Sequence, residues 1–99
     1  MEEKLKKCRN VIDDIDSKIL KLLLERKNQV IKIGEVKREN GLDIFDPERE
    51  RKKIEKLNME LQEIYKDSLS DKDNNEKIKR YIENIFFSII DESKKMQEK

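Results

Sequence analysis

Among the cationic side chains in the N-terminal part of the chain, three have positions that could serve an anion site: Arg9, Arg26 and Lys37. Arg26 lies within a seam of mostly apolar residues that alternates spacings of four and three from Cys8 to Val36. Arg26 and Lys37 are eleven positions apart, which on one helix is about 20° in angle and about 16 Å along the axis. Both side chains can therefore lean toward one small anionic ligand bound between them.

Arg9 cannot easily reach that ligand from the same chain. It precedes Arg26 by seventeen positions, which is about 25 Å along a helix and about 100° around it. In an antiparallel dimer, however, Arg9 could reach the site of the neighbouring chain.

Polar residues also follow the apolar faces of two later segments. Extending the stripe of Ile54, Leu57, Leu61 and Ile64 back by one step leads to Glu50. A third stripe continues to Ser93 and Gln97; its apolar members are Ile78, Ile82, Ile85, Phe86, Ile89 and Ile90. Several cations and an acid directed inward would make a poor core unless a polar anion completes it. The combined pattern predicts a site for a small dianion.

Each of these residues also has a purely structural interpretation. Arg26 could pair with a carboxylate, since buried arginines are usually paired. Gln29, the next seam position, could fix the register between helices. Lys37 could be a solvated helix end, Cys8 a small core residue, and Gly34 a position that lets two helices approach closely.

The elements that must position these residues are all helical. The segment from Glu3 to Glu39 lacks proline and keeps the seam throughout, so we expect one helix of about 36 residues and about 54 Å. A compact chain of this size has a radius of gyration of about 13 Å, so the helix must extend beyond its own domain. A partner chain is implied, most simply in a two-fold homodimer.

Two further helices are predicted. Asn40 and Gly41 end the first helix, and Asp46 is placed to cap a second helix that begins there or at Pro47. Residues 66–77 form a polar connection, and a third helix runs from about Asn75 to Gln97. The expected architecture is an all-α, three-helix chain forming a single domain over residues 1–99.

Composition narrows the function. Apolar residues make up 34% of the chain and charged residues 47%, with 24 Lys and Arg against 23 Asp and Glu. A net charge of +1 gives no general reason to bind nucleic acid or an anionic membrane. One cysteine and no histidine exclude an internal disulfide and a Cys-based zinc site. We expect neither metal nor membrane span, and a location in the cytoplasm.

The motifs in this order resemble the all-helical class of chorismate mutases over nearly the whole chain. They are "CRNVIDDIDSKILKLLLERKNQVIKIGEVK", with Arg9, Arg26 and Lys37 in the pattern R-x16-R-x10-K, then "DPERE" at 46–50 and "IDESKKMQ" at 90–97. The connection at 66–77 departs from the family by its greater length. The resemblance implies two intertwined chains, each with one long and two shorter helices.

The resemblance also implies a role for each residue. Arg26, with Arg9 of the other chain, would bind the two carboxylates of chorismate. Arg49 would add positive charge, and Ser93 would hydrogen-bond a carboxylate. Further roles concern the uncharged oxygens of the substrate: Lys37 and Gln97 would donate to the ether oxygen, and Glu50, with the backbone near Asp46, would hold the ring hydroxyl.

The implied reaction is a Claisen rearrangement of chorismate to prephenate, used in making phenylalanine and tyrosine. It requires no nucleophile, metal or cofactor, which suits a chain without histidine or a Gly-rich phosphate loop. Two alternatives stay open at this point. An isochorismate pyruvate lyase resembles the same fold, and a non-catalytic helical dimerisation or regulatory module could use inward charges only to set register.

Overall fold

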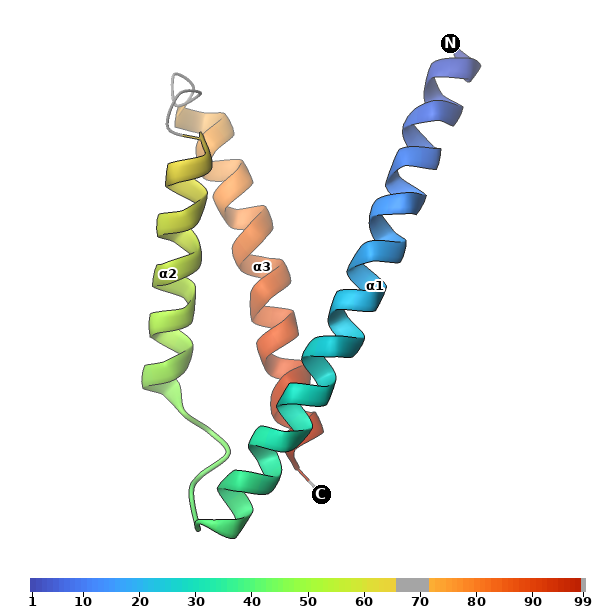
Figure 1. Cartoon of the computed structure of the whole chain (residues 1–99). Helices are drawn as coiled ribbons and strands as arrows, with labels where there is room; N and C mark the ends of the chain where they lie inside the picture. The colour runs from blue at the N-terminus through green and yellow to red at the C-terminus, as the bar shows by residue number, and fades with distance from the viewer. Residues whose placement is uncertain (66–71, 99) are drawn as a thin grey trace.

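The chain is described by a computed structural model that covers residues 1–65 and 72–98, and this part consists of three helices (Figure 1). Helix α1 spans Glu2–Glu39, α2 spans Pro47–Tyr65 and α3 spans Lys72–Gln97. The all-α class and the long N-terminal helix are thus confirmed. None of the described helices has both the length and the apolar character needed to cross a bilayer.

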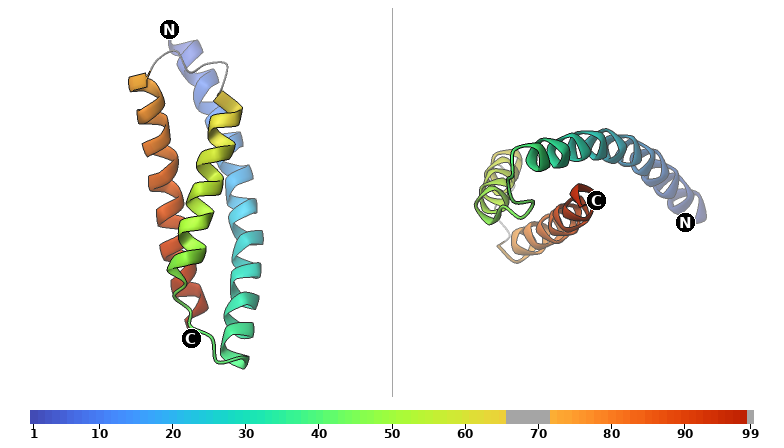
Figure 2. Two further views of the ribbon diagram at one scale, coloured as in Figure 1. Left: turned by 90° about the vertical axis from the view of Figure 1, so that its left-hand side faces the viewer. Right: turned by 90° about the horizontal axis from the view of Figure 1, so that it is seen from below.

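Helix α3 is the central element, because it packs on both α1 and α2. Helices α2 and α3 run side by side in opposite directions, and α1 meets α3 only along its C-terminal half (Figures 1 and 2). The N-terminal half of α1 diverges from the other two helices. The molecule is accordingly elongated, with extents of 56 × 30 × 16 Å and a radius of gyration of 17.3 Å. The prediction that α1 extends beyond its own domain is confirmed.

The buried core is small and lies where α1 crosses the C-terminal part of α3. Val30 and Gly34 of α1 and Ile90 and Gln97 of α3 are buried there. The apolar seam on the diverging half of α1 is exposed in the single chain. Its exposed members include Ile12, Ile15, Ile19 and Leu22. The prediction that Cys8 packs in a core is wrong for the single chain: its thiol is exposed on this half.

The predicted C-terminal end of α1 and the predicted start of α2 are confirmed. Helix α1 stops before Gly41, whose φ of 65° is a left-handed conformation that glycine adopts without strain. Helix α2 begins at Pro47, where the missing N–H of proline is harmless. The Asp46 Oδ1 atom accepts a hydrogen bond of 3.1 Å from the Arg49 backbone N–H. Asp46 therefore caps α2 as expected.

Helix α3 begins three residues before its predicted approximate start. The helix begins at Lys72 rather than at Asn75, so the second half of the expected 66–77 connection is helical. The apolar stripe marks only the packed part of a helix, whereas polar residues readily occupy its first turn. Residues 66–71 of that connection lie outside the described residues.

The Asp46 cap makes a measurable contribution to stability. Asp46→Ala should lower the free energy of unfolding by about 1 kcal/mol, because it removes the acceptor for an N–H that has no helical partner. Urea denaturation followed by circular dichroism measures this. Asp43→Ala, which removes the same charge from an exposed position of the same loop, is the control. Equal free energies of unfolding in the two variants would contradict the capping role of Asp46.

Candidate functional site

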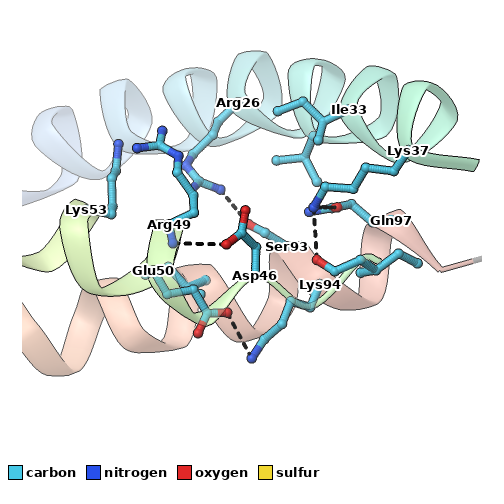
Figure 3. A pocket seen from close by; sticks show the side chains of 13 residues that line it. Arg26, Ile33, Lys37, Asp46, Arg49, Glu50, Lys53, Ser93, Lys94 and Gln97 are labelled. Atoms are coloured by element: carbon cyan, nitrogen blue, oxygen red, sulfur yellow. Dashed lines mark hydrogen bonds and ion pairs between the residues drawn. The ribbon is translucent and has the colours of Figure 1, made fainter. Parts of the chain in front are cut away.

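A cavity of about 290 Å³ opens where the C-terminal half of α1 faces the start of α2 and the end of α3. Figure 3 shows polar side chains from all three helices converging on it. Seven of the eight residues singled out in the sequence line this cavity: Arg26, Lys37, Asp46, Arg49, Glu50, Ser93 and Gln97. The fold therefore brings together residues separated by up to 71 positions, from Arg26 to Gln97.

Arg26 is held in place by α3. Its Nη1 donates a hydrogen bond to Ser93 Oγ, and Ser93 Oγ donates to the Ile89 carbonyl at 2.6 Å. The acceptor for the guanidinium is therefore a hydroxyl rather than a carboxylate. The interaction fixes the direction of Arg26 without neutralising its charge, and within the described part of the chain its other N–H groups are left for a ligand.

Lys37 is oriented in the same way at the opposite end of the cavity. Its Nζ donates to the Ile44 carbonyl at 2.9 Å and to Gln97 Oε1 at 2.8 Å. Both acceptors are uncharged, and an ammonium has three N–H groups. As far as residues 1–65 and 72–98 show, one donor of Lys37 thus remains for a ligand. Because Oε1 of Gln97 faces Lys37, its amide nitrogen is the atom left to donate.

Gln97 itself is anchored by α1. Gln97 is buried, with only 8% of its surface exposed. Its backbone carbonyl accepts a 2.6 Å hydrogen bond from Arg38 Nη1. A Cβ on Gly34 would lie 3.0 Å from the Gln97 Cα and 3.1 Å from its carbonyl oxygen. The absence of a side chain at Gly34 thus permits this contact, which confirms its expected role in close helix approach.

Glu50 carries negative charge into the cavity and is paired. Lys94 Nζ lies 3.1 Å from Glu50 Oε1 and 3.4 Å from Asp91 Oδ1, and stands 4.8 Å from the centre of the Phe45 ring. The hydrogen bond to Glu50 is the main reason that the pKa of Lys94 is raised. The second carboxylate oxygen of Glu50 remains available to accept from a ligand hydroxyl.

Sequence reasoning missed two cationic residues that line the cavity, Lys53 and Lys94. Lys53 follows Arg49 by four positions, and this spacing places both on one face of α2, so the signal was present. Lys94 gave a weaker signal: it follows Ile90 of the third stripe by four positions but lies at the edge of that stripe. Its ion pair with Glu50 and its contact with the Phe45 ring hold it at the cavity.

Two other residues lie away from the cavity. Arg9 is exposed on the diverging half of α1 and borders a shallow depression with Leu5 and Asp13. Gln29, which was expected to fix the register between helices, is exposed and does not line the cavity.

The arrangement suits a small organic anion. Arg26, Arg49 and Lys37 supply positive charge, Glu50 and Ser93 supply hydrogen-bond acceptors, and Val30, Ile33 and Ile90 supply apolar walls; all of them line the cavity. Its volume is near the lower limit for small-molecule sites. Lys37 and Gln97 at one end of the cavity, with Arg26 and Arg49 at the other, would hold a polar ring compound in one orientation.

Comparison with known proteins identifies relatives. The family model of chorismate mutase type II matches residues 8–98. A chorismate mutase of Methanocaldococcus jannaschii is 49% identical over 51 residues, which are 52% of this chain and 52% of that protein. A bifunctional chorismate mutase/prephenate dehydratase of Aquifex aeolicus is 46% identical over 63 residues, 64% of this chain and 17% of that protein.

A T-protein of Haemophilus influenzae is 42% identical over 48 residues, 48% of this chain and 13% of that protein. The matched segment therefore spans about half of the first relative and a small part of the longer ones. No solved structure matches the chain with significant similarity.

The contact between Gly34 and Gln97 can be tested directly. Alanine in place of glycine in a helix normally adds about 1 kcal/mol of stability, but here Gly34→Ala must push the end of α3 outward by a few tenths of an ångström. We expect the variant to lack that gain and its crystal structure to show Gln97 displaced from Lys37. The control is Asn28→Ala, at an exposed position of the same helix. It should show the gain in stability, smaller than that for glycine, which alanine normally gives in place of asparagine. A fully stabilised Gly34→Ala variant with Gln97 unmoved would contradict this interpretation.

Proposed function

The chain belongs to the chorismate mutase type II family, and we propose that it catalyses the rearrangement of chorismate to prephenate in the cavity between α1, α2 and α3. The family match over residues 8–98 supports the reaction class. The observation that carries the proposal is the cavity, in which Arg26 and Lys37 are oriented by uncharged acceptors and keep their charge for an anion. We also propose that the three helices act as a single mutase domain.

The two carboxylates of chorismate bind at the cationic end of the cavity. Arg26 binds one carboxylate with the N–H groups that Ser93 does not use, and its planar fork matches a carboxylate bidentately. Ser93 adds a hydrogen bond once its hydroxyl proton turns from the Ile89 carbonyl to the carboxylate, and Arg49 adds positive charge from the first turn of α2.

The ether oxygen of the substrate lies at the other end, against Lys37 and Gln97. Lys37 donates its remaining N–H, and Gln97 donates from its amide nitrogen. The Lys37–Gln97 hydrogen bond of 2.8 Å keeps the two donors side by side. Glu50 accepts a hydrogen bond from the ring hydroxyl, assisted by the backbone near Asp46. Its pairing with Lys94 supports this role by fixing the carboxylate.

The reaction is intramolecular. The bond between the ether oxygen and the ring carbon breaks while a carbon–carbon bond forms between the enolpyruvyl group and the ring, and every atom is retained. No nucleophile, metal or redox cofactor is needed. The protein holds the enolpyruvyl group over the ring and places cationic donors where negative charge grows on the ether oxygen. Both effects require rigid donors, which the bonds of Lys37 to α3 and to the Ile44 carbonyl supply.

We propose that two copies of the chain associate and that Arg9 of each copy enters the site of the other. The exposed apolar seam of α1 supports this assembly, because Ile12, Ile19 and Leu22 are 54%, 47% and 62% exposed in the single chain. Arg9 lies on the same diverging half of α1, far from its own cavity. An intertwined dimer would bury the seam and complete the carboxylate end of each site.

The first experiment is to incubate the protein with chorismate, and separately with isochorismate, and to identify the products by chromatography. We expect prephenate from chorismate with no added cofactor. Lys37→Ala and Arg26→Ala should each reduce kcat/KM on the order of a hundredfold or more, because each removes a preorganised donor. Lys32→Ala, an exposed lysine on the same helix, should retain activity.

Three outcomes would count against the proposal. Salicylate and pyruvate from isochorismate without prephenate would assign a lyase instead. No turnover of either substrate by folded protein would favour an interaction module. Full activity in Lys37→Ala or Arg26→Ala would reject the assignment of the cavity.

Mixing inactive variants tests the contribution of Arg9 across the dimer. If Arg9 serves the neighbouring site, a mixed dimer of Arg9→Ala and Lys37→Ala chains has one intact site and one doubly altered site. Refolding the two variants together should then restore about a quarter of wild-type activity, since about half of the dimers are mixed. The control mixes Arg26→Ala with Lys37→Ala, which alters both sites and restores nothing. Equal failure of both mixtures would show that Arg9 does not act across the dimer.

A further inference from the structure

The cavity contains more positive charge than the proposed roles use. Five cationic and two acidic side chains line it: Arg26, Lys37, Arg49, Lys53 and Lys94 against Asp46 and Glu50. Lys94 is paired with Glu50. The Asp46 carboxylate is occupied in capping α2. The charge that remains for a ligand therefore includes Lys53, to which the family resemblance assigns no role.

Lys53 lies on α2 one turn after Arg49 and is partly buried. Figure 3 shows its side chain rising from α2 toward α1, beside Arg49 and Arg26. Within residues 1–65 and 72–98, no carboxylate lies within ion-pair distance of its ammonium group. Its charge is thus directed toward the cationic end of the cavity without a partner from the described chain.

The surroundings of Lys53 disfavour its charge. Its pKa is lowered, first by burial and then by the charges of Arg49, Arg26 and Lys56, whereas Glu60 acts in the opposite direction. An apolar side chain at this position would cover α1 without that unfavourable interaction. A lysine among arginines becomes favourable once an anion binds between them.

We propose that Lys53 is a further substrate-binding residue, which contacts a carboxylate of the substrate together with Arg26 and Arg49. This proposal rests on the proposed function, since it concerns the same site and the same dianion. Lys53 lies at the end of the cavity away from Lys37 and Gln97 (Figure 3), so it does not reach the breaking bond. Its contribution is affinity and preference for dicarboxylates, expressed in KM more than in kcat.

The test compares Lys53→Met with wild type in the chorismate assay. Methionine keeps the length and apolar stem of lysine without its charge. We expect KM to rise about tenfold, the effect of losing one charge-assisted contact, while kcat stays within about threefold. The rise of KM with added salt should also become weaker, because one fewer charge attracts the dianion. Inhibition by cyclic dicarboxylates should weaken more than inhibition by cyclic monocarboxylates.

Two further variants separate charge from packing. Lys52→Met removes the same charge from the adjacent, exposed position of α2, and its KM and salt dependence should match wild type. Lys53→Arg keeps the charge and should keep KM within about threefold of wild type. Circular dichroism establishes that each variant is folded.

The outcomes distinguish this proposal from the proposed function. An unchanged KM and salt dependence in Lys53→Met, or a Lys53→Arg variant as impaired as Lys53→Met, would overturn the role of Lys53 while wild-type turnover stands. Absence of prephenate formation by wild-type protein would overturn both.

Discussion

The orientation of cations by uncharged acceptors is the constraint on which the site depends. Two exposed cations elsewhere on α2, Arg51 and Lys52, are paired with Glu48, at 2.6 Å and 3.8 Å. In the cavity, Arg26 instead donates to Ser93, and Lys37 to the Ile44 carbonyl and Gln97. A carboxylate in these places would orient the cations equally well but would cancel the charge that an anionic ligand needs.

This arrangement requires the end of α3 to lie close against α1. The approach is close because Gly34 has no side chain, and Arg38 holds the last carbonyl of the helix at 2.6 Å. The four most buried residues of the described chain cluster at the same crossing. Packing and function therefore share one contact: the small core that fixes α3 on α1 also fixes Gln97 beside Lys37. This sharing explains why the apolar seam of α1 contains an arginine, since one face of the helix is both core and cavity wall.

Helical periodicity was sufficient to predict the three helices and part of the cavity lining, for a physical reason, whereas Asp46 and Arg49 were assigned to the site only through the family resemblance. Residues on the packed face of each helix must meet the other helices, so polar residues in line with an apolar stripe, such as Glu50, Ser93 and Gln97, had to converge. The start of α3 was not predictable in this way, because its first turn is polar and makes no stripe. Lys94 was missed because its position depends on how Phe45 and Glu50 pack, which is a tertiary property. The roles of the residues came from the family resemblance and stay predictions.

The shape of α1 connects the site to the proposed assembly. A helix of 38 residues needs packing along its length, since isolated helical segments gain most of their stability from tertiary contacts. Among residues 1–65 and 72–98, only the C-terminal half of α1 has such contacts. Each apolar side chain of the seam that becomes fully buried contributes about 1.5–3 kcal/mol, and several of them, from Ile12 to Leu22, lie on the uncovered half. In the proposed dimer, a second copy with the same seam would cover this surface under two-fold symmetry. Because Arg9 lies on that half as well, the association that would stabilise α1 is also the one that would bring a further cation to each cavity.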